Sequence, residues 1–166
     1  MNAIPRDVVG AREYLLVKPE QGKSPTGSPH LFKATASDTA GHFEFIVSSF
    51  APMTGPPLHL HRHQYDTFYI LEGMLTVQAG EEVFDIGPGD FLSIPPGVAH
   101  TFDNFHNGDK PVRSINLMTP DGLFDMFEGM AQVAEGPDQG AEMEKVAEHH
   151  GTVIVGPPLR VTLGLG

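Results

Sequence analysis

Short apolar runs separated by glycine and proline limit what this chain can fold into more than any other feature of its sequence. The chain includes 19 glycines and 15 prolines, which punctuate the apolar runs along its length instead of gathering in one tail. Runs of this kind are typical of β-strands joined by tight turns. Roughly ten such strands in one chain indicate a sandwich or a barrel, so we expect an all-β fold.

The strands can be placed along the chain from these runs and from their alternation. The expected strands cover residues 12–18, 30–36, 42–50, 66–72, 74–79, 83–86, 91–94, 100–105, 112–118 and 152–155. A further strand carries His59, and it begins at an edge or after Pro57 because proline has no N–H for a sheet interior. We expect a loop over 19–29 and a turn over 37–41.

After residue 118 the apolar residues change to helical spacing. Thr119 and Pro120 suit the cap and the first position of a helix. The apolar positions that recur on one face of this helix are Leu123, Phe127, Met130 and Ala134. A second helix is expected over 137–150, and Gly151 suits its C-terminal end.

Length and composition narrow the class of protein. A chain of 166 residues fits one domain over 1–166, with a barrel core at about 30–118 and a helical extension over 119–150. Its formal net charge of −11 argues against nucleic acid and anionic membranes as partners. The chain has no cysteine, no run long enough to span a membrane, and charges where a signal peptide needs apolar residues. We therefore expect a cytoplasmic protein without disulfides.

A cluster of histidines with one carboxylate is the best candidate for chemistry. His59 and His61 are two residues apart, so they project from the same face of a strand. Asp66 follows, and His100 comes after a Pro-Pro-Gly turn. Imidazoles with a carboxylate suit Fe, Mn, Ni, Co or Zn as a divalent ion and leave positions open for water or substrate. We expect one such metal per chain, although sequence alone does not identify the element.

These residues resemble the two sequence motifs of the cupin superfamily. The second motif, G-x5-P-x-G-x2-H-x3-N, is matched by Gly89, Pro95, Gly97, His100 and Asn104. In the first motif, G-x5-H-x-H-x3or4-E-x6-G, the matching residues are His59, His61 and Gly73. Asp66 stands where glutamate is usual, and Gly55 lies closer to His59 than the pattern asks. The resemblance implies a jelly-roll β-barrel, here with short C-terminal helices.

The flanking phrases PPLHLH and TFYILEG resemble small single-domain cupins of the quercetin-dioxygenase-like type. That resemblance implies a metal-dependent dioxygenase acting on a small aromatic or enolic substrate. An isomerase and a non-catalytic ligand sensor remain alternatives, since the histidines of some cupins bind no metal. The resemblance also implies a homodimer, and residues 12–18 are the candidate edge strand for it.

The role of Asp66 is open at this point. Its side chain is one methylene shorter than glutamate, so it either ligates the metal directly or stands off and acts as proton acceptor for the substrate. A structural pairing with Arg62 or His63 is the alternative. His63 would point to the same face of the strand as His59. Gly55, His61 and His63 satisfy the first half of the motif, but only two residues separate His63 from Asp66, which is too few for the complete motif.

Several apolar and polar residues are candidates for a substrate pocket, although each is also a plausible core residue. These candidates are Phe43, Phe45, Phe68, Phe102, Asn116 and Met118, and, after them, Met126 and Phe127. His42, His149 and His150 lie beside a turn or a helix end, and we interpret them as surface residues.

Overall fold

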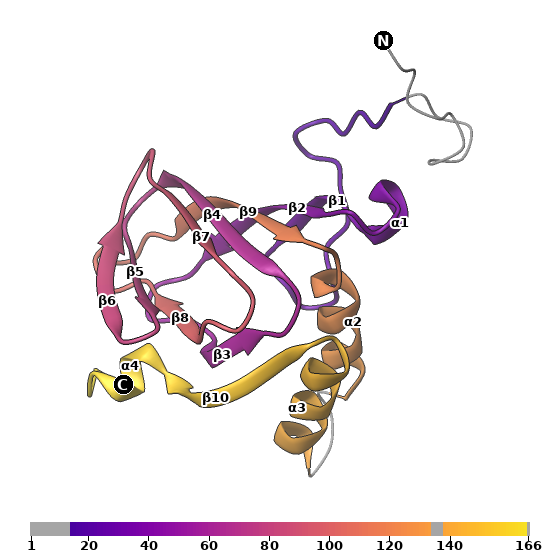
Figure 1. Cartoon of the computed structure of the whole chain (residues 1–166). Helices are drawn as coiled ribbons and strands as arrows, with labels where there is room; N and C mark the ends of the chain where they lie inside the picture. Colours follow the sequence, from indigo (N-terminus) through magenta and orange to yellow (C-terminus); the bar gives the residue numbers. More distant parts are fainter. Residues whose placement is uncertain (1–13, 134–137, 166) are drawn as a thin grey trace.

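Two five-stranded antiparallel sheets face each other and form the body of the molecule, as Figure 1 shows. This is a computed structural model, and it describes residues 14–133 and 138–165. The first sheet has the order β1 (Leu31–Ala34), β2 (Glu44–Phe50), β9 (Val112–Thr119), β4 (Tyr65–Glu72) and β7 (Phe91–Ile94). The second sheet has the order β10 (Thr152–Pro158), β3 (Pro57–His61), β8 (His100–Asp103), β5 (Leu75–Ala79) and β6 (Glu82–Ile86). The expected all-β jelly roll with short C-terminal helices is confirmed.

The hydrophobic core lies between the two sheets. Strand alternation points every second side chain of β4 and β9 inward, so Phe68, Ile70 and Val112 are almost fully buried. They pack against Leu75 and Val77 of the facing sheet. Each sheet therefore buries one face against the other, which is what holds two such layers together.

The strand expected over residues 12–18 is wrong where it can be tested. Residues 14–18 adopt no strand, and Tyr14 and Leu16 are 74% and 63% exposed. Residues 12 and 13 lie outside the described residues. Apolar runs of this length fit a strand only when a neighbouring strand pairs with them, and 14–18 pair with none among the described residues.

The turn expected over 37–41 is also wrong, because α1 (Ala36–Thr39) occupies most of it. The Asp38 carboxylate accepts hydrogen bonds from the Thr35 N–H at 3.1 Å and from the Thr35 hydroxyl at 2.8 Å. Asp38 thus provides a hydrogen-bond acceptor for the backbone N–H of Thr35, the residue that caps the helix, and this stabilises the first turn.

Two longer helices, α2 (Leu123–Val133) and α3 (Gln139–His149), follow β9 and lie side by side at one end of the sheets (Figure 1). Gly151, with φ of 82°, follows α3 as expected. After the last strand the chain forms a short helix, α4 (Leu159–Thr162). Among the helices of the described residues, none is long and apolar enough to cross a membrane.

The start of α2 differs from the cap expected at Thr119 and Pro120. The N–H groups of Leu123 and Phe124 donate to the carboxylate of Glu44 at 2.8 and 3.2 Å. Glu44 belongs to β2 and is 1% exposed. Burial raises the pKa of Glu44, and the backbone hydrogen bonds from the helix oppose that rise. A carboxylate from a distant strand therefore caps the helix and ties it to the sheet.

We expect Glu44→Ala to lower the free energy of unfolding by about 2 kcal/mol, since it leaves two helix N–H groups without their acceptor. Urea denaturation measures the change. Glu81→Ala, in an exposed turn, is the matched control and should shift stability by less than about 0.5 kcal/mol. Equal stabilities of the two variants would contradict this role of Glu44.

Candidate metal centre

Four side chains converge between the two sheets: His59, His61, Asp66 and His100. One potential ligand atom from each lies within 4.8 Å of all the others. Every one of the four is buried, with exposures between 1% and 7%. His59 and His61 come from β3, His100 from β8, and Asp66 from β4 of the facing sheet. The group therefore bridges both layers of the fold.

Local structure explains why the histidines meet. His59 and His61 share the inward face of β3, and His59 is directly opposite His100 in the pairing of β3 with β8. Gly97 has φ of 83° and donates its N–H to the carbonyl of His61 at 2.8 Å, which turns the chain into β8. Gly55 passes so close to β8 that a Cβ would lie 1.8 Å from the carbonyl oxygen of Phe102. Both glycines are thus required by the backbone around the site.

The outer nitrogen of each imidazole is held by a hydrogen bond. The Nδ1 atoms of His59 and His100 are 2.8 and 2.9 Å from the carbonyl oxygens of Pro57 and Val98. A carbonyl only accepts, so Nδ1 carries the proton and Nε2 is left as a lone-pair donor that faces the other ligands. His61 Nδ1 is 2.9 Å from the hydroxyl of Thr152, on β10.

The two oxygens of the Asp66 carboxylate have different partners. Its Oδ1 accepts a hydrogen bond from Asn116 Nδ2 at 2.6 Å. Its Oδ2 lies 3.3 Å from His100 Nε2 and 3.8 Å from His61 Nε2. The alternative, a structural pairing of Asp66 with Arg62 or His63, is therefore not found.

The donor set fits a divalent transition metal. His61 Nε2 is buried and has no hydrogen-bond partner among the described residues, although such a buried atom normally requires one. Two ligand atoms that lie about 2.0–2.2 Å from one ion are separated by about 2.8–3.6 Å at octahedral or tetrahedral angles. The distances from Asp66 Oδ2 to the two imidazoles are close to this range, so the shorter aspartate reaches the cluster without a glutamate's extra methylene.

The protonation states also suit metal ligands. Burial, together with the neighbouring His100 and His61, lowers the pKa of His59 to about 3. Burial alone would raise the pKa of Asp66, but the adjacent imidazoles of His100 and His61 hold it below its ordinary value. At neutral pH the site therefore presents a neutral imidazole at His59 and an ionised carboxylate, the forms that bind a cation.

A cavity of about 500 Å³ opens onto the cluster. His59, His61 and Asp66 form part of its wall, and helix α2 closes another side. The apolar side chains that line it include Ile46, Phe50, Phe102, Leu123, Met126, Phe127, Met130 and Ile154. A mainly apolar cavity with a few convergent polar groups is the usual form of a small-molecule site.

The structure places some of the expected pocket residues elsewhere. Phe102, Asn116, Met126 and Phe127 line the cavity as expected. Phe68 is instead packed in the core, at 1% exposure. Met118 lies beside a small second cavity behind His61.

Phe43 and Phe45, two further candidates for the pocket, do not line this cavity. They do share one face of the chain, but it is the outer face, because Glu44 and Ile46 are the buried neighbours. Phe43 is 37% exposed. Strand alternation places Phe43 and Phe45 on a common face but does not indicate which face of the strand is inward.

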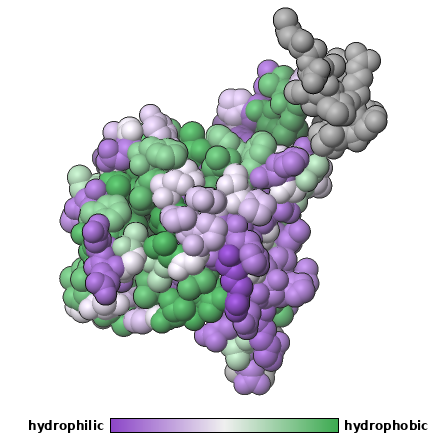
Figure 2. All heavy atoms as spheres, in the orientation of Figure 1, coloured by the Kyte–Doolittle hydropathy of each residue, from purple (hydrophilic) through white to green (hydrophobic). Residues whose placement is uncertain are grey.

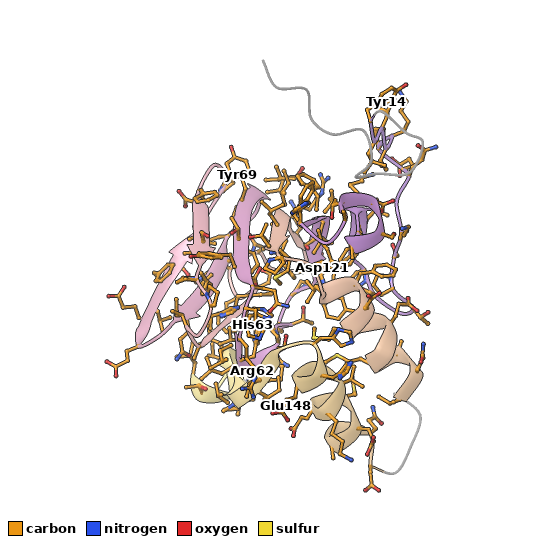
Figure 3. All side chains as sticks on the ribbon, turned by 45° about the vertical axis from the view of Figure 1, so that its right-hand side comes forward. Tyr14, Arg62, His63, Tyr69, Asp121 and Glu148 are labelled. Atoms are coloured by element: carbon orange, nitrogen blue, oxygen red, sulfur yellow. The ribbon has the colours of Figure 1, made fainter. Side chains whose placement is uncertain are left out.

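His63 does not belong to the ligand group. It is exposed, and in Figure 3 it lies with Arg62 toward the end of the molecule that carries Glu148. Arg62 and Glu148 form an ion pair of 3.0 Å at the surface. His42 and His149 are exposed as well, as expected.

Two residues around the site were missed from sequence. Thr152 was expected only as part of a strand, and His30 only as the start of another. Neither has a motif around it, and both reach the site through contacts between segments far apart in the chain. The one available indication was the polar character of each within an apolar run.

The sequence profile of the cupin domain family matches residues 46–118. This span includes β3, β4 and β8, and hence all four residues of the cluster. The chain carries a cupin domain.

A relative with a described activity is similar to this cupin over a longer stretch. It is the quercetin 2,3-dioxygenase of Bacillus subtilis (strain 168), 33% identical over 121 residues, which are 71% of this chain. The chain spans only 34% of that relative's length.

Solved structures with a similar course of the chain include KdgF from Halomonas sp. and a predicted oxalate decarboxylase from Thermotoga maritima. The first is 18% identical with a TM-score of 0.48, over 55% of this cupin and 76% of that chain. The second is 17% identical with a TM-score of 0.49, over 55% and 78% respectively.

We expect His61→Ala and His100→Ala each to abolish stoichiometric metal in the purified cupin, because each removes one of the three converging nitrogens. Elemental analysis by mass spectrometry measures the content. His63→Ala, two residues from His61 but exposed, is the matched control and should leave metal content unchanged. Undiminished metal in both His61→Ala and His100→Ala would rule the site out.

We expect Thr152→Val to weaken metal binding by about 10- to 100-fold, since it removes the group that orients His61 while nearly keeping the side chain's volume. Thr152→Ser retains the hydroxyl and should bind within a few-fold of the unmodified cupin. Competition with a chelating indicator gives both affinities. Equal weakening in the two variants would point to packing of β10 in place of the hydrogen bond.

Proposed function

We propose that this cupin is a metal-dependent dioxygenase that acts on a small aromatic or enolic molecule bearing a hydroxyl group. The observation that carries the proposal is the position of the cluster, with three imidazoles and one carboxylate at the wall of an apolar cavity. The similarity to a quercetin 2,3-dioxygenase supports the reaction class. The proposal extends to this chain an activity described for a much longer relative.

The cavity suits a flat, mainly apolar ligand. Phe50 and Phe102 meet at a ring-centroid distance of 4.6 Å, and both line the cavity. Met126 and Met130 of α2 add flexible thioether surface, which adapts to ligands of different outline. Such a wall excludes water from the end of the cavity where the polar residues converge, and this strengthens electrostatic interactions there.

His59, His61, Asp66 and His100 would hold the metal. A bound divalent ion supplies Lewis acidity, which favours the deprotonated form of a hydroxyl group beside it. Fe, Mn, Ni, Co and Zn all suit this donor set.

Asp66 is the residue that we assign as proton acceptor from the substrate hydroxyl. Asn116 fixes one carboxylate oxygen at 2.6 Å and leaves Oδ2 facing the cluster. Asn116 is itself anchored, because its amide also donates to the carbonyl of Thr67 at 3.0 Å. The lowered pKa of Asp66 keeps Oδ2 ionised at neutral pH, so that it can accept a hydrogen bond from a bound hydroxyl.

Two further expectations stay predictions. One is the single domain over 1–166 with its core at 30–118 and its extension over 119–150. The other is the homodimer. The edge strand expected to form it, over 12–18, has no support, because residues 14–18 adopt no strand.

Apolar side chains do lie on the outer face of the first sheet, where Tyr69 pairs with Phe91 at 43% and 70% exposure. Figure 2 shows hydrophobic surface over the strands and a more hydrophilic surface over the helices.

We expect Asp66→Asn to keep most of the metal but to lose at least about 100-fold in turnover, since the amide occupies the same space and cannot accept the proton. Oxygen uptake over a panel of flavonols, including quercetin, and catechols measures the activity, and elemental analysis measures the metal. Asp85→Asn, a substitution of an exposed aspartate, is the control. Full activity of Asp66→Asn would remove this residue from the mechanism, and no oxygen uptake by the unmodified cupin on any compound would contradict the dioxygenase proposal.

A further inference from the structure

A partly buried histidine, His30, stands in the cavity wall outside the metal cluster. Its imidazole stacks on Phe127 of α2, with a centroid distance of 5.8 Å and an angle of 23°. It also meets the ring of Phe50 edge-on at 5.4 Å. The ring is therefore fixed in orientation by two aromatic neighbours, which themselves line the cavity.

One polar atom of the His30 ring forms no hydrogen bond within the described residues. Its Nδ1 is buried and has no hydrogen-bond partner there. Burial lowers the pKa of this imidazole, so the ring is neutral at pH 7 and offers one donor and one acceptor. A buried polar group without a partner costs about 1–3 kcal/mol, whereas phenylalanine would fill a similar space without that cost. An unpartnered imidazole in a ligand cavity is explained if the ligand supplies the partner.

His30 and the metal cluster lie at different ends of the cavity. His30 immediately precedes β1 at the edge of the first sheet, while Asp66 is on β4, with β2 and β9 between them. Three strand spacings of about 4.8 Å separate β1 from β4 by roughly 14 Å across the sheet. The rings of Phe50 and Phe102 fill the interval, since Phe50 contacts both His30 and Phe102, which is two residues from His100.

We propose that His30 is a specificity-determining residue that hydrogen-bonds a second polar group of the ligand, at the end remote from the metal ligands. The inference rests on the proposed function, because it assigns the near end of the ligand to the metal cluster. It predicts a preference for extended aromatic ligands with oxygen at both ends over ligands with oxygen at the near end alone. The aromatic wall between the two ends then contacts the flat middle of the ligand.

Two flavonols that differ by one hydroxyl test the inference: 3-hydroxyflavone and 3,4′-dihydroxyflavone. Both carry the hydroxyl and carbonyl that suit the metal end, and only the second has a hydroxyl at the far end. Their fluorescence reports binding directly, and the chain has no tryptophan to interfere. We expect the full-length, metal-loaded cupin to bind 3,4′-dihydroxyflavone about three- to tenfold more tightly, the effect of one additional hydrogen bond.

His30→Phe should abolish this preference while changing the affinity for 3-hydroxyflavone less than about threefold, because it keeps the aromatic contacts with Phe50 and Phe127. His30→Leu serves as a second variant if the first does not fold. His42→Phe makes the same substitution at an exposed position and should retain the preference.

Equal affinity of the unmodified cupin for the two flavonols, failure to bind either, or an undiminished preference in the folded His30 variants would overturn the inference. Measuring oxygen uptake with the same two flavonols tests the proposed dioxygenase activity separately from the binding preference. A far-end preference without turnover leaves His30 as a determinant of ligand binding and contradicts only the dioxygenase. Turnover without the preference contradicts only the role of His30.

Discussion

Burial of four polar side chains at one point between the sheets is the constraint on which the rest of this structure depends. A carboxylate and three imidazoles lose their hydration there, and such groups are stable only when hydrogen bonds or a cation replace the water. Hydrogen bonds with Pro57, Val98, Thr152 and Asn116 satisfy the outward-facing atoms. The atoms that remain converge on one another, and a divalent cation is the partner that would stabilise all of them together.

The C-terminal part of the chain takes part in this site, although it lies beyond the residues that match the cupin profile. Glu44 caps α2 and so fixes the helix that closes the cavity. Thr152, in β10 after α3, orients His61. Helix α2 thus forms part of the cavity wall, while α3 leads into the strand whose Thr152 contacts His61.

The sequence predicted the part of the site that depends on spacing within a strand or a turn. His59 and His61 shared a face because strand alternation has a period of two, and Gly97 turned the chain before His100. It did not predict which face of β2 was inward, since Glu44 and Ser48 are buried there and would ordinarily mark the exposed side. The cap from Glu44 and the place of His30 depend on contacts between distant segments, which no local pattern contains.

X-ray absorption spectroscopy on the metal-loaded protein tests the central claim most directly. If His59, His61, His100 and Asp66 surround one ion, the first shell should contain three imidazole nitrogens and at least one oxygen at about 2.0–2.2 Å. The rings should add the multiple-scattering features of three histidines. A first shell of oxygen alone, without scattering from imidazole, would show that the metal binds elsewhere and would contradict the account.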